Sequence, residues 1–517
     1  MKESYMSIIH IRRRIFAEVA RLAYEDIRLE NLSESTMRII PDDYGFMQGN
    51  IFQERAVVGE RLRMGLGLNP HNDASFRSLI TDDEIENIEE VTYSYPLVQV
   101  LKFACEACPT KEYIITDQCR KCIARPCTVV CPVQAVSVGI DRMVIDQDKC
   151  VGCGRCKNTC PYSAIIKSER ACSSVCGVNA IESDEIGRAV INEEKCVSCG
   201  RCLTNCPFGA ISDKSQIYQL IKALQGDTPV DAMLAPSFVQ QFGDTIHPMQ
   251  IIEGLRKLGF RSVIEVGLGA DFTTLRESRE FVERVPHEIP YMGTSCCASW
   301  SMLVEKHFPN EYQYISDSAS PMIESAKYHK KKDPHAKTVF IGPCISKKVE
   351  ALGENVRGYV DYVITYEELM GMFSSQRITL SELEITRDLQ DDASKTARGY
   401  GVAGGVAGAV KSAILEIDPT REVKIEGAHT LQECIKMRRL AKAGQRNGYL
   451  LEGMACPGGC IGGPGTIASF NRVRKGVSQF MNESKYQSPF DNEYIDEGLR
   501  DKSLHIEAEH SGEKESR

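Results

Sequence analysis

The chain has 517 residues, which is too long for one hydrophobic core and predicts about three domains. Its formal net charge of −9 argues against nucleic acid as the main partner, because phosphate binding needs a basic surface. No run reaches the roughly 18 apolar residues of a membrane span, and no apolar export signal follows Arg13-Arg14, so we expect a cytoplasmic protein without a membrane span.

Residues 1–95 contain no cysteine and predict a helical N-terminal domain of unknown role. Ile11, Ile15, Val19 and Leu22 recur at helical spacing, which favours an amphipathic helix near the start. No residue in this segment carries recognisable chemistry, so a packing or docking role is expected.

Residues 96–215 hold 16 of the 22 cysteines and predict ferredoxin-like domains with up to four [4Fe–4S] clusters. Two runs have the C-x2-C-x2-C-x3-C-P spacing of bacterial ferredoxins, in which three cysteines bind one cluster and the fourth reaches a neighbouring cluster. They start at Cys150 and Cys196, and a third run from Cys119 has a longer middle loop. A structural zinc site is disfavoured, because zinc sites rarely repeat this spacing.

The four remaining cysteines of this region bring the number of thiols to the 16 that four clusters need. Cys172-x3-Cys176 resembles the second half of a ferredoxin run, and Cys105-x2-Cys108 supplies a first half from a distance. The thiols then form four sets, although three clusters, or two, remain alternatives. The predicted sets are Cys119, Cys122, Cys127 with Cys160; Cys150, Cys153, Cys156 with Cys131; Cys196, Cys199, Cys202 with Cys176; and Cys105, Cys108, Cys172 with Cys206.

Residues 225–502 have the sequence pattern of an α/β domain, and we expect residues 503–517 to form a polar tail. Apolar strand-like runs alternate with helical patterns, which favours mainly parallel sheets with helices outside. The strands are expected at 230–234, 262–266, 338–341, 362–364 and 423–425, and helices at 274–285 and 367–373.

Three segments of this domain carry reactive side chains. They are Thr294–Trp300 (TSCCASW), Val339–Glu350 (VFIGPCISKKVE) and Leu451–Gly465 (LEGMACPGGCIGGPG). In this order they resemble the signature segments of the [FeFe]-hydrogenase catalytic domain, whose patterns run TSCC-P-x-W, PC-x-x-K-K-x-E and E-x-MACPGGC-x-x-G-G. The resemblance implies two lobes of mainly parallel sheet flanked by helices, with an H-cluster between them, joined to α+β ferredoxin-like domains and a helical N-terminal segment.

The resemblance also implies a set of cofactor residues. The H-cluster is a [4Fe–4S] cubane plus a diiron subsite with CO, cyanide and a dithiolate bridge. Its cubane ligands would be Cys297, Cys344, Cys456 and Cys460, with Cys460 also bridging to the diiron subsite. Lys347 would contact one cyanide. The residues expected to line the diiron pocket are Ala235, Pro236, Ser237 and Met454.

A proton route follows from the same resemblance. Cys296 would deliver the proton, and a thiol suits this role because it can lose and regain a proton at modest cost near neutral pH. Beyond it, Glu277, Ser316 and Glu280 would form the relay, with Arg284 at the surface end. Glu277, Glu280 and Arg284 fall on one face of a helix, as a relay requires.

Four departures from the common family pattern mark a divergent subgroup. Ala298 replaces proline, Gly342 replaces methionine, Tyr400 replaces phenylalanine and Met322 replaces glutamine. They leave every expected ligand and proton carrier intact, and they alter the surroundings that tune potential and access. Cys434 matches no signature and is expected to be a buried thiol; Trp300 is expected to pack behind Cys297.

The implied activity is reversible reduction of protons to H2. Electrons would come from a ferredoxin or similar carrier through three to four accessory [4Fe–4S] clusters, and maturation proteins would insert the diiron subsite. Two alternatives use the same domain: a non-catalytic redox or H2 sensor, and a hydrogenase-like iron–sulfur assembly protein. Retention of Cys296, its relay and Lys347 weighs against both.

Overall fold

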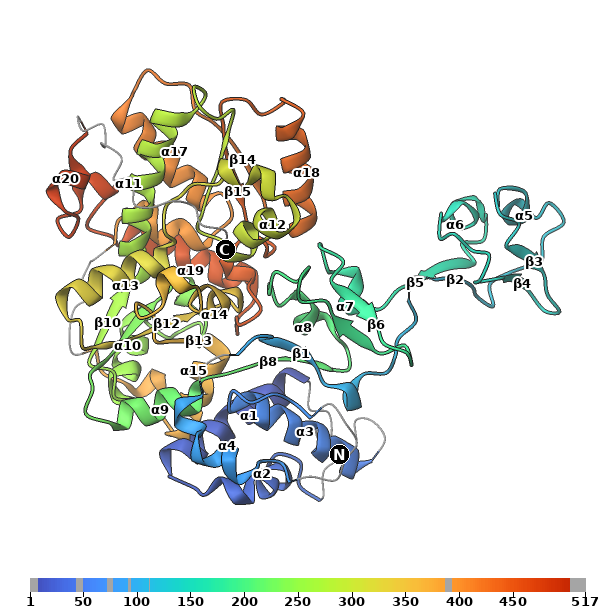
Figure 1. The fold of residues 1–517 in the computed structure, drawn as a ribbon, viewed down its shortest axis with the longest axis horizontal. Coiled ribbons are helices and arrows are strands. Elements are labelled where there is room, and N and C mark those ends of the chain that lie inside the picture. Colours follow the sequence, from blue (N-terminus) through green and yellow to red (C-terminus); the bar gives the residue numbers. More distant parts are fainter. Residues whose placement is uncertain are drawn as a thin grey trace.

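The computed structural model describes residues 8–42, 50–71, 78–91, 94–110, 112–385 and 393–502. The predicted tail, residues 503–517, lies outside the described residues. Figure 1 shows a large α/β body, a helical layer beneath it, and two small lobes, of which the outer one projects far from the rest.

The first sheet of the α/β body has four parallel strands in the order β10-β9-β12-β13. Its strands are mostly apolar and mostly buried, as expected when helices cover both faces. The strands are β9 (Val230–Leu234), β10 (Ser262–Glu265), β12 (Lys337–Gly342) and β13 (Tyr362–Thr365). The helices around it include α10 (Pro248–Lys257), α13 (Pro321–Lys332), α14 (Ser346–Glu350) and α15 (Tyr366–Ser375).

The second sheet has three parallel strands in the order β11-β15-β14. They are β11 (Met292–Gly293), β14 (Lys424–Ala428) and β15 (Tyr449–Gly453). The neighbouring helices are α11 (Val266–Arg284), α12 (Ala298–His307), α16 (Lys395–Arg398), α17 (Gly405–Ile417), α18 (Leu431–Lys442), α19 (Phe470–Asn482) and α20 (Glu497–Arg500). The predicted pair of parallel, helix-flanked lobes is confirmed; α11 starts earlier than expected, and the strand expected at 423–425 starts one residue later and runs further.

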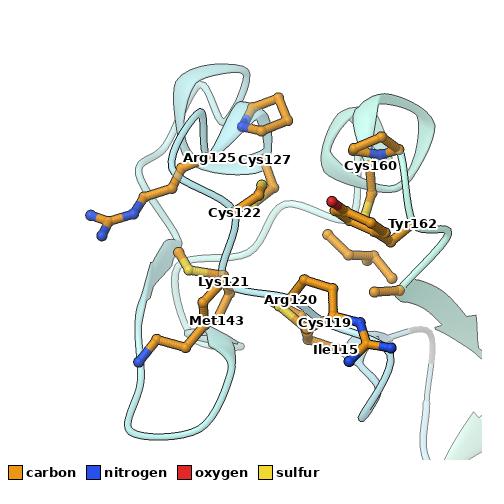
Figure 2. Close-up of a pocket in the computed structure, with 14 residues that line it drawn as sticks. Ile115, Cys119, Arg120, Lys121, Cys122, Arg125, Cys127, Met143, Cys160 and Tyr162 are labelled. Carbon is orange, nitrogen blue, oxygen red and sulfur yellow. The ribbon is translucent and has the colours of Figure 1, made fainter.

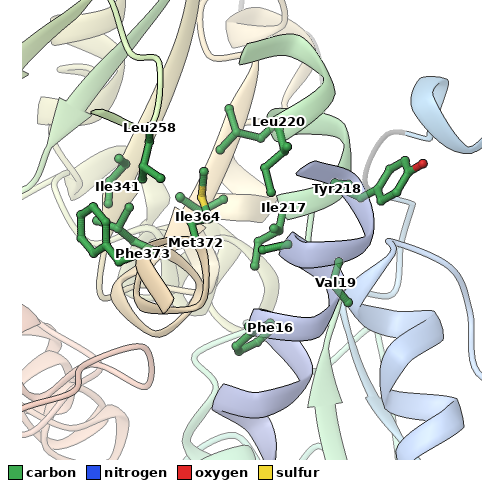
Figure 3. Packing of buried hydrophobic residues seen from close by; sticks show 14 of the residues in the cluster. Phe16, Val19, Ile217, Tyr218, Leu220, Leu258, Ile341, Ile364, Met372 and Phe373 are labelled. Carbon is green, nitrogen blue, oxygen red and sulfur yellow. The ribbon is translucent and has the colours of Figure 1, made fainter. Parts of the chain in front are cut away.

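The N-terminal helices share a hydrophobic core with the first sheet. They are α1 (Ile8–Tyr24), α2 (Leu32–Ile39), α3 (Ile51–Gly65) and α4 (Asp82–Glu86), and α9 (Ile217–Gln225) packs beside them. Figure 3 shows Phe16 and Val19 of α1 near Ile217 and Leu220 of α9 and Met372 of α15. The expected amphipathic helix is present, and its apolar face is covered by residues beyond 215. Residue 95 therefore marks where the cysteine-rich sequence begins, but the hydrophobic core contains residues from both sides of this boundary.

The cysteine-rich region forms two small lobes, each built on antiparallel strand pairs. The inner lobe contains β1 (Val98–Val100) paired with β8 (Ile211–Asp213), β6 (Ile181–Ser183) paired with β7 (Ala189–Ile191), α7 (Ala171–Ser174) and α8 (Arg201–Asn205). The outer lobe contains β2 (Glu112–Ile115) paired with β5 (Ile165–Ser168), β3 (Val136–Val138) paired with β4 (Met143–Ile145), α5 (Pro126–Val129) and α6 (Arg155–Thr159).

The outer lobe is inserted within the sequence of the inner lobe. The chain leaves the inner lobe after Cys108, builds the outer lobe over 112–168, and re-enters the inner lobe at α7 with Cys172. This nesting explains why the first ferredoxin run of the inner lobe is split into two halves in the sequence.

A buried ion-pair cluster fastens the inner lobe to the α/β body. Lys348 of α14 is fully buried, and its Nζ lies 3.0 Å from both Asp213 of β8 and Glu368 of α15. It also donates a hydrogen bond to the Lys214 carbonyl at 2.7 Å. Within the described ranges, no helix is both long and apolar enough to cross a membrane.

Candidate functional site

The three signature segments each follow a parallel strand of the α/β body. Cys296 and Cys297 come after β11, Cys344 comes after β12, and Cys456 and Cys460 come after β15. Because the carboxyl ends of parallel strands meet at one edge of a sheet, the two sheets deliver all three loops to the crevice between the lobes.

The four expected cubane ligands lie near one another. Burial raises the pKa of Cys297, Cys456 and Cys460, and each of these thiols is also affected by the charge of the neighbouring Cys344 thiolate. Each sulfur-bearing residue keeps some accessible surface, although most of its chain neighbours are buried. Thiols gathered close together in this way suit an iron–sulfur centre, because binding iron removes their protons.

The loop between Cys456 and Cys460 requires glycine. Gly459 has φ +94°, and a Cβ there would lie 2.7 Å from the backbone nitrogen of Ala403. Gly458 has φ +74° and lies against the Phe470 ring. The two glycines therefore let the loop reverse direction while the chain packs closely against it.

Cys296 lies beside a buried carboxyl group. Glu277 of α11 accepts hydrogen bonds from the Ser295 backbone nitrogen at 2.7 Å and from the Ser295 hydroxyl at 2.8 Å. Burial raises the pKa of Glu277 to about 7 against the opposing effect of the Ser295 bonds, while Glu280 and Glu452 raise it further. Burial, and then the Glu277 charge, raise the pKa of Cys296. Glu277 can thus hold or release a proton near neutral pH.

The outer part of the expected relay forms a continuous hydrogen-bonded group. The Ser316 hydroxyl donates to Glu280 Oε2 at 2.5 Å, and Arg284 pairs with the other carboxylate oxygen of Glu280. Burial raises the pKa of Glu280 despite these partners. Arg284 is part-exposed and so places this group at the protein surface.

Lys347 is buried between the signature segments. Its Nζ donates to the Cys296 carbonyl at 3.1 Å and pairs with Glu350 at 2.5 Å. Burial lowers the pKa of Lys347, and the Glu350 carboxylate and the nearby thiolates outweigh that effect, so that its pKa is raised. The ammonium group therefore stays charged beside Cys344 and Cys296.

The expected pocket-lining residues lie around the same crevice. Ser237 is buried and shares a 2.8 Å hydrogen bond with the Tyr366 hydroxyl, which in turn donates to the Ala235 carbonyl at 3.1 Å. Met454 is buried in the core of the second lobe, and Pro236 begins the short turn that contains Ser237.

Two departures have a visible structural context. A Cβ on Gly342 would lie 2.6 Å from the Phe340 ring, so Phe340 occupies the space that a larger side chain would need. The Tyr400 hydroxyl shares a 2.7 Å hydrogen bond with Thr274, and burial and then the nearby Glu277 charge raise the pKa of Tyr400. Ala298 starts α12, and Met322 is fully buried under the first sheet.

The cysteines of the two small lobes form the predicted sets. Three pockets are each lined by four cysteines: Cys119, Cys122, Cys127 and Cys160; Cys131, Cys150, Cys153 and Cys156; and Cys105, Cys108, Cys172 and Cys206. Figure 2 shows the first of these pockets, with the Arg125 side chain extending away from the sulfurs. In the fourth set, the pKa of Cys202 is raised by burial and by the nearby thiolates of Cys176, Cys196 and Cys199.

No three His, Cys, Asp or Glu side chains of the described residues converge as ligands of a single metal ion do. A cubane differs in this respect, since each of its four thiolates binds a different iron atom. The grouping of the sulfurs fits such clusters, and their identity as ligands stays a prediction.

The fourth set adjoins the signature segments. Gly200 of its ferredoxin run has φ +72°, and a Cβ there would lie 2.7 Å from Ile345 and 2.8 Å from Pro464. Helix α12, which begins next to Cys297, donates hydrogen bonds from Ser299 to Val197 and from Lys306 to Cys196. The inner lobe therefore presents this set directly to the crevice.

Several residues of the site were not identified from the sequence. Ser295, Glu350 and Glu452 all lie within the signature segments, so their position there was an available signal. Glu452 is buried, accepts hydrogen bonds from the Gly404 and Ala407 backbone nitrogens, and affects Cys296. The predictions for Cys434 and Trp300 are confirmed: Cys434 is a buried free thiol, and Trp300 is buried in the cluster that Cys297 contacts.

Two family models match the chain. Residues 228–464 match the iron only hydrogenase large subunit, C-terminal domain. Residues 117–169 and 166–217 match the LdpA Fe-S cluster-binding domain. The first match contains the first two signature segments and the third except for Gly465. The second covers most of both small lobes but begins after Cys105 and Cys108.

The chain is also similar to characterised proteins of two kinds. Iron hydrogenase 1 of Clostridium pasteurianum is 28% identical over 62% of this chain and 64% of its own length. The periplasmic [Fe] hydrogenase large subunit of Nitratidesulfovibrio vulgaris is 29% identical over 64% of this chain and 88% of its own length. Cytosolic iron–sulfur assembly component 3 of Rattus norvegicus is 25% identical over 46% of this chain and 60% of its own length. The similarity thus spans less than two thirds of the first and third relatives.

Proposed function

We propose that this chain, an [FeFe]-hydrogenase-like iron–sulfur protein, is a hydrogenase that reduces protons to H2 reversibly. The observation that carries the proposal is the meeting of Cys297, Cys344, Cys456 and Cys460 in one crevice, with Cys296 and Glu277 beside them. An assembly protein needs the cluster thiols alone. A proton-reducing enzyme also needs a buried acid and a thiol at the reacting centre.

The residues of the crevice fit a bound H-cluster, which would supply the metal centre where protons and electrons combine. Cys297, Cys344, Cys456 and Cys460 would hold its cubane, and the Lys347 ammonium would donate to an anionic ligand. Ala235, Pro236, Ser237 and Met454 would shield the diiron side from water.

The proton path depends on groups whose pKa values burial has shifted. The Cys296 thiol stays protonated at neutral pH because its pKa is raised. Glu277, with a pKa of about 7, can return a proton to Cys296. Glu280 lies one helical turn further along α11 and is joined through Ser316 and Arg284 to the surface.

Electrons would enter through the outer lobe. This lobe projects from the body (Figure 1), and its first pocket is lined by Arg120, Lys121 and Arg125 as well as by cysteines. Ile123 in the same loop is 99% exposed. A basic ring around an exposed apolar side chain suits an acidic one-electron carrier such as a ferredoxin, because opposite charges speed encounter.

Infrared spectroscopy of the chain matured with hydrogenase maturation proteins tests the proposal. Iron-bound CO and cyanide bands are expected, and their absence would leave an assembly or sensing role. Cys296→Ala should keep these bands and lose most H2 turnover, since only the proton donor is removed. Full activity of this variant would contradict the proposed proton route. Cys434→Ala, which removes a buried thiol that belongs to no signature segment, is the matched control.

A further inference from the structure

Two buried guanidinium groups flank the cysteine set of the inner lobe formed by Cys105, Cys108, Cys172 and Cys206. Arg61 comes from α3 of the N-terminal segment, and Arg170 lies between the outer lobe and α7. Each is only 5% exposed. Neither residue belongs to a cysteine motif, so no local pattern connects it with a metal centre.

Arg170 lines the pocket of this set. Its Nη2 donates to the Cys108 carbonyl at 3.0 Å and to the Gly187 carbonyl at 3.0 Å, and its Nη1 donates to the Glu182 carbonyl at 3.1 Å. Burial raises the pKa of Cys172 to about 11, and the Arg170 charge opposes that increase. The guanidinium is therefore close enough to influence charge on these sulfurs.

Arg61 approaches the set from the other side. Its Nη2 donates to the carbonyl of Gly209, three residues after Cys206, in the turn where the Ala210 nitrogen donates to the Cys206 sulfur at 3.3 Å. Burial lowers the pKa of Arg61 to about 10, and the Cys206 thiolate acts in the opposite direction. Arg61 is thus charged at neutral pH and is held against a ligand-bearing turn.

Neither guanidinium has a carboxylate partner among the residues that the structure describes. Arg61 Nη1 and Arg170 Nε are buried and form no hydrogen bond there. A buried cation is costly unless an anion compensates it. Glu106 also lines the pocket, but its side chain is exposed and screened by water. The remaining groups that can become anionic at this position are the four thiols, which lose their protons when they bind iron.

We propose that Arg61 and Arg170 raise the reduction potential of an iron–sulfur cluster held by Cys105, Cys108, Cys172 and Cys206. This inference rests on the proposed cluster binding. Reduction transfers one electron from the reduced carrier to the cluster and changes no bond or proton. The added negative charge is stabilised by buried cations, whose field is weakly screened in the protein interior. Helix α3 of the N-terminal segment thereby helps to determine which cluster of the chain is reduced first.

The outer lobe offers a contrast within the same chain. Arg155 is next to Cys156 in sequence, yet its side chain is exposed. Water screens an exposed charge far more than a buried one. Arg155→Gln is therefore the matched control for Arg61→Gln and Arg170→Gln.

The test is a redox titration of the full-length, cluster-loaded chain, monitored by electron paramagnetic resonance. The component altered in Cys108→Ser identifies the relevant cluster. Arg61→Gln and Arg170→Gln should each lower its reduction equilibrium about tenfold, which is 59 mV for one electron. Arg155→Gln should change its own cluster less than about threefold, or 28 mV by the same relation.

The outcomes separate charge from structure. An unchanged potential in both glutamine variants, with iron content intact, overturns the inference. Arg61→Lys keeps the positive charge but loses the planar guanidinium group, so it replaces Arg61→Gln if that variant loses iron. A reduction potential close to that of the wild type then supports the charge effect, and a tenfold fall in the reduction equilibrium contradicts it. If the wild type lacks any signal that Cys108→Ser alters, the proposed cluster binding itself fails.

Discussion

The proton affinity of Glu277 is set by a balance between burial and two hydrogen bonds from Ser295. The rise of its pKa from 4.5 to about 7 corresponds to about 3 kcal/mol of preference for the neutral acid in the folded protein. Because the pKa is raised, the folded protein holds this proton more tightly than the unfolded chain. The associated stability is present below pH 4.5 and is lost as the pH rises through about 7.

Ser295→Ala removes the hydroxyl donor and leaves the backbone donor in place. A hydrogen bond to a charged group contributes about 1.5–3 kcal/mol, which corresponds to about one to two pH units. Loss of a donor to the carboxylate disfavours the charged form. The pKa of Glu277 should therefore rise by that amount, and the alkaline limb of H2 evolution should move to higher pH with it.

Infrared difference spectroscopy can follow the carboxylic acid band that Glu277→Gln abolishes. The wild-type band should titrate near pH 7, and the Ser295→Ala band should titrate higher. Ser299→Ala is the control, because this buried serine donates to the Val197 carbonyl and to no carboxylate. A midpoint that stays in place or falls in Ser295→Ala would refute the reasoning.

The other predictions concern the carrier surface, the ligand loop and the lobe attachment. The double variant Lys121→Glu and Arg125→Glu should slow reduction of the chain by an acidic ferredoxin about tenfold or more at low salt, as measured by stopped-flow absorbance. The control variant Lys475→Glu should leave this rate unchanged. Gly459→Ala should destabilise the protein by about 1–2 kcal/mol or more from its left-handed backbone alone and reduce iron content, because its Cβ meets backbone at 2.7 Å. Lys348→Met should cost about 3–5 kcal/mol in urea unfolding, because it removes the ammonium that pairs with the buried carboxylates of Asp213 and Glu368. An effect no larger than that of Lys475→Met would contradict this prediction.

The fold class was predictable because the relevant patterns are local. The strands at 230–234 and 262–265 contain apolar runs and lie where they were expected, although the second ends one residue early. The start of α11 was missed, because Val266–Thr273 continues the apolar run of β10 and a buried helix cannot be told from a strand by composition.

The candidate site was predictable to the extent that side chains occur in recognisable spacing. The signature cysteines and the helix face of Glu277 and Glu280 are of this kind. Ser295 and Glu452 lie within the signature segments, yet their roles were not assigned, because these roles depend on hydrogen bonds and burial against other segments of the chain. The pKa of Glu277 likewise depends on burial that no local pattern reports.

Taken alone, the sequence determined the chemistry available: thiols at cluster spacing, a glycine-bearing ligand loop, and alternating strands and helices. These follow from short-range spacing and backbone preferences. Tertiary structure decided which thiols face one another, that the outer lobe is nested in the inner one, and that α1 completes a core formed mainly by residues beyond 215. It also placed Arg61 beside Cys206, 145 positions away. Such contacts join distant segments, and only the burial of the whole chain selects them.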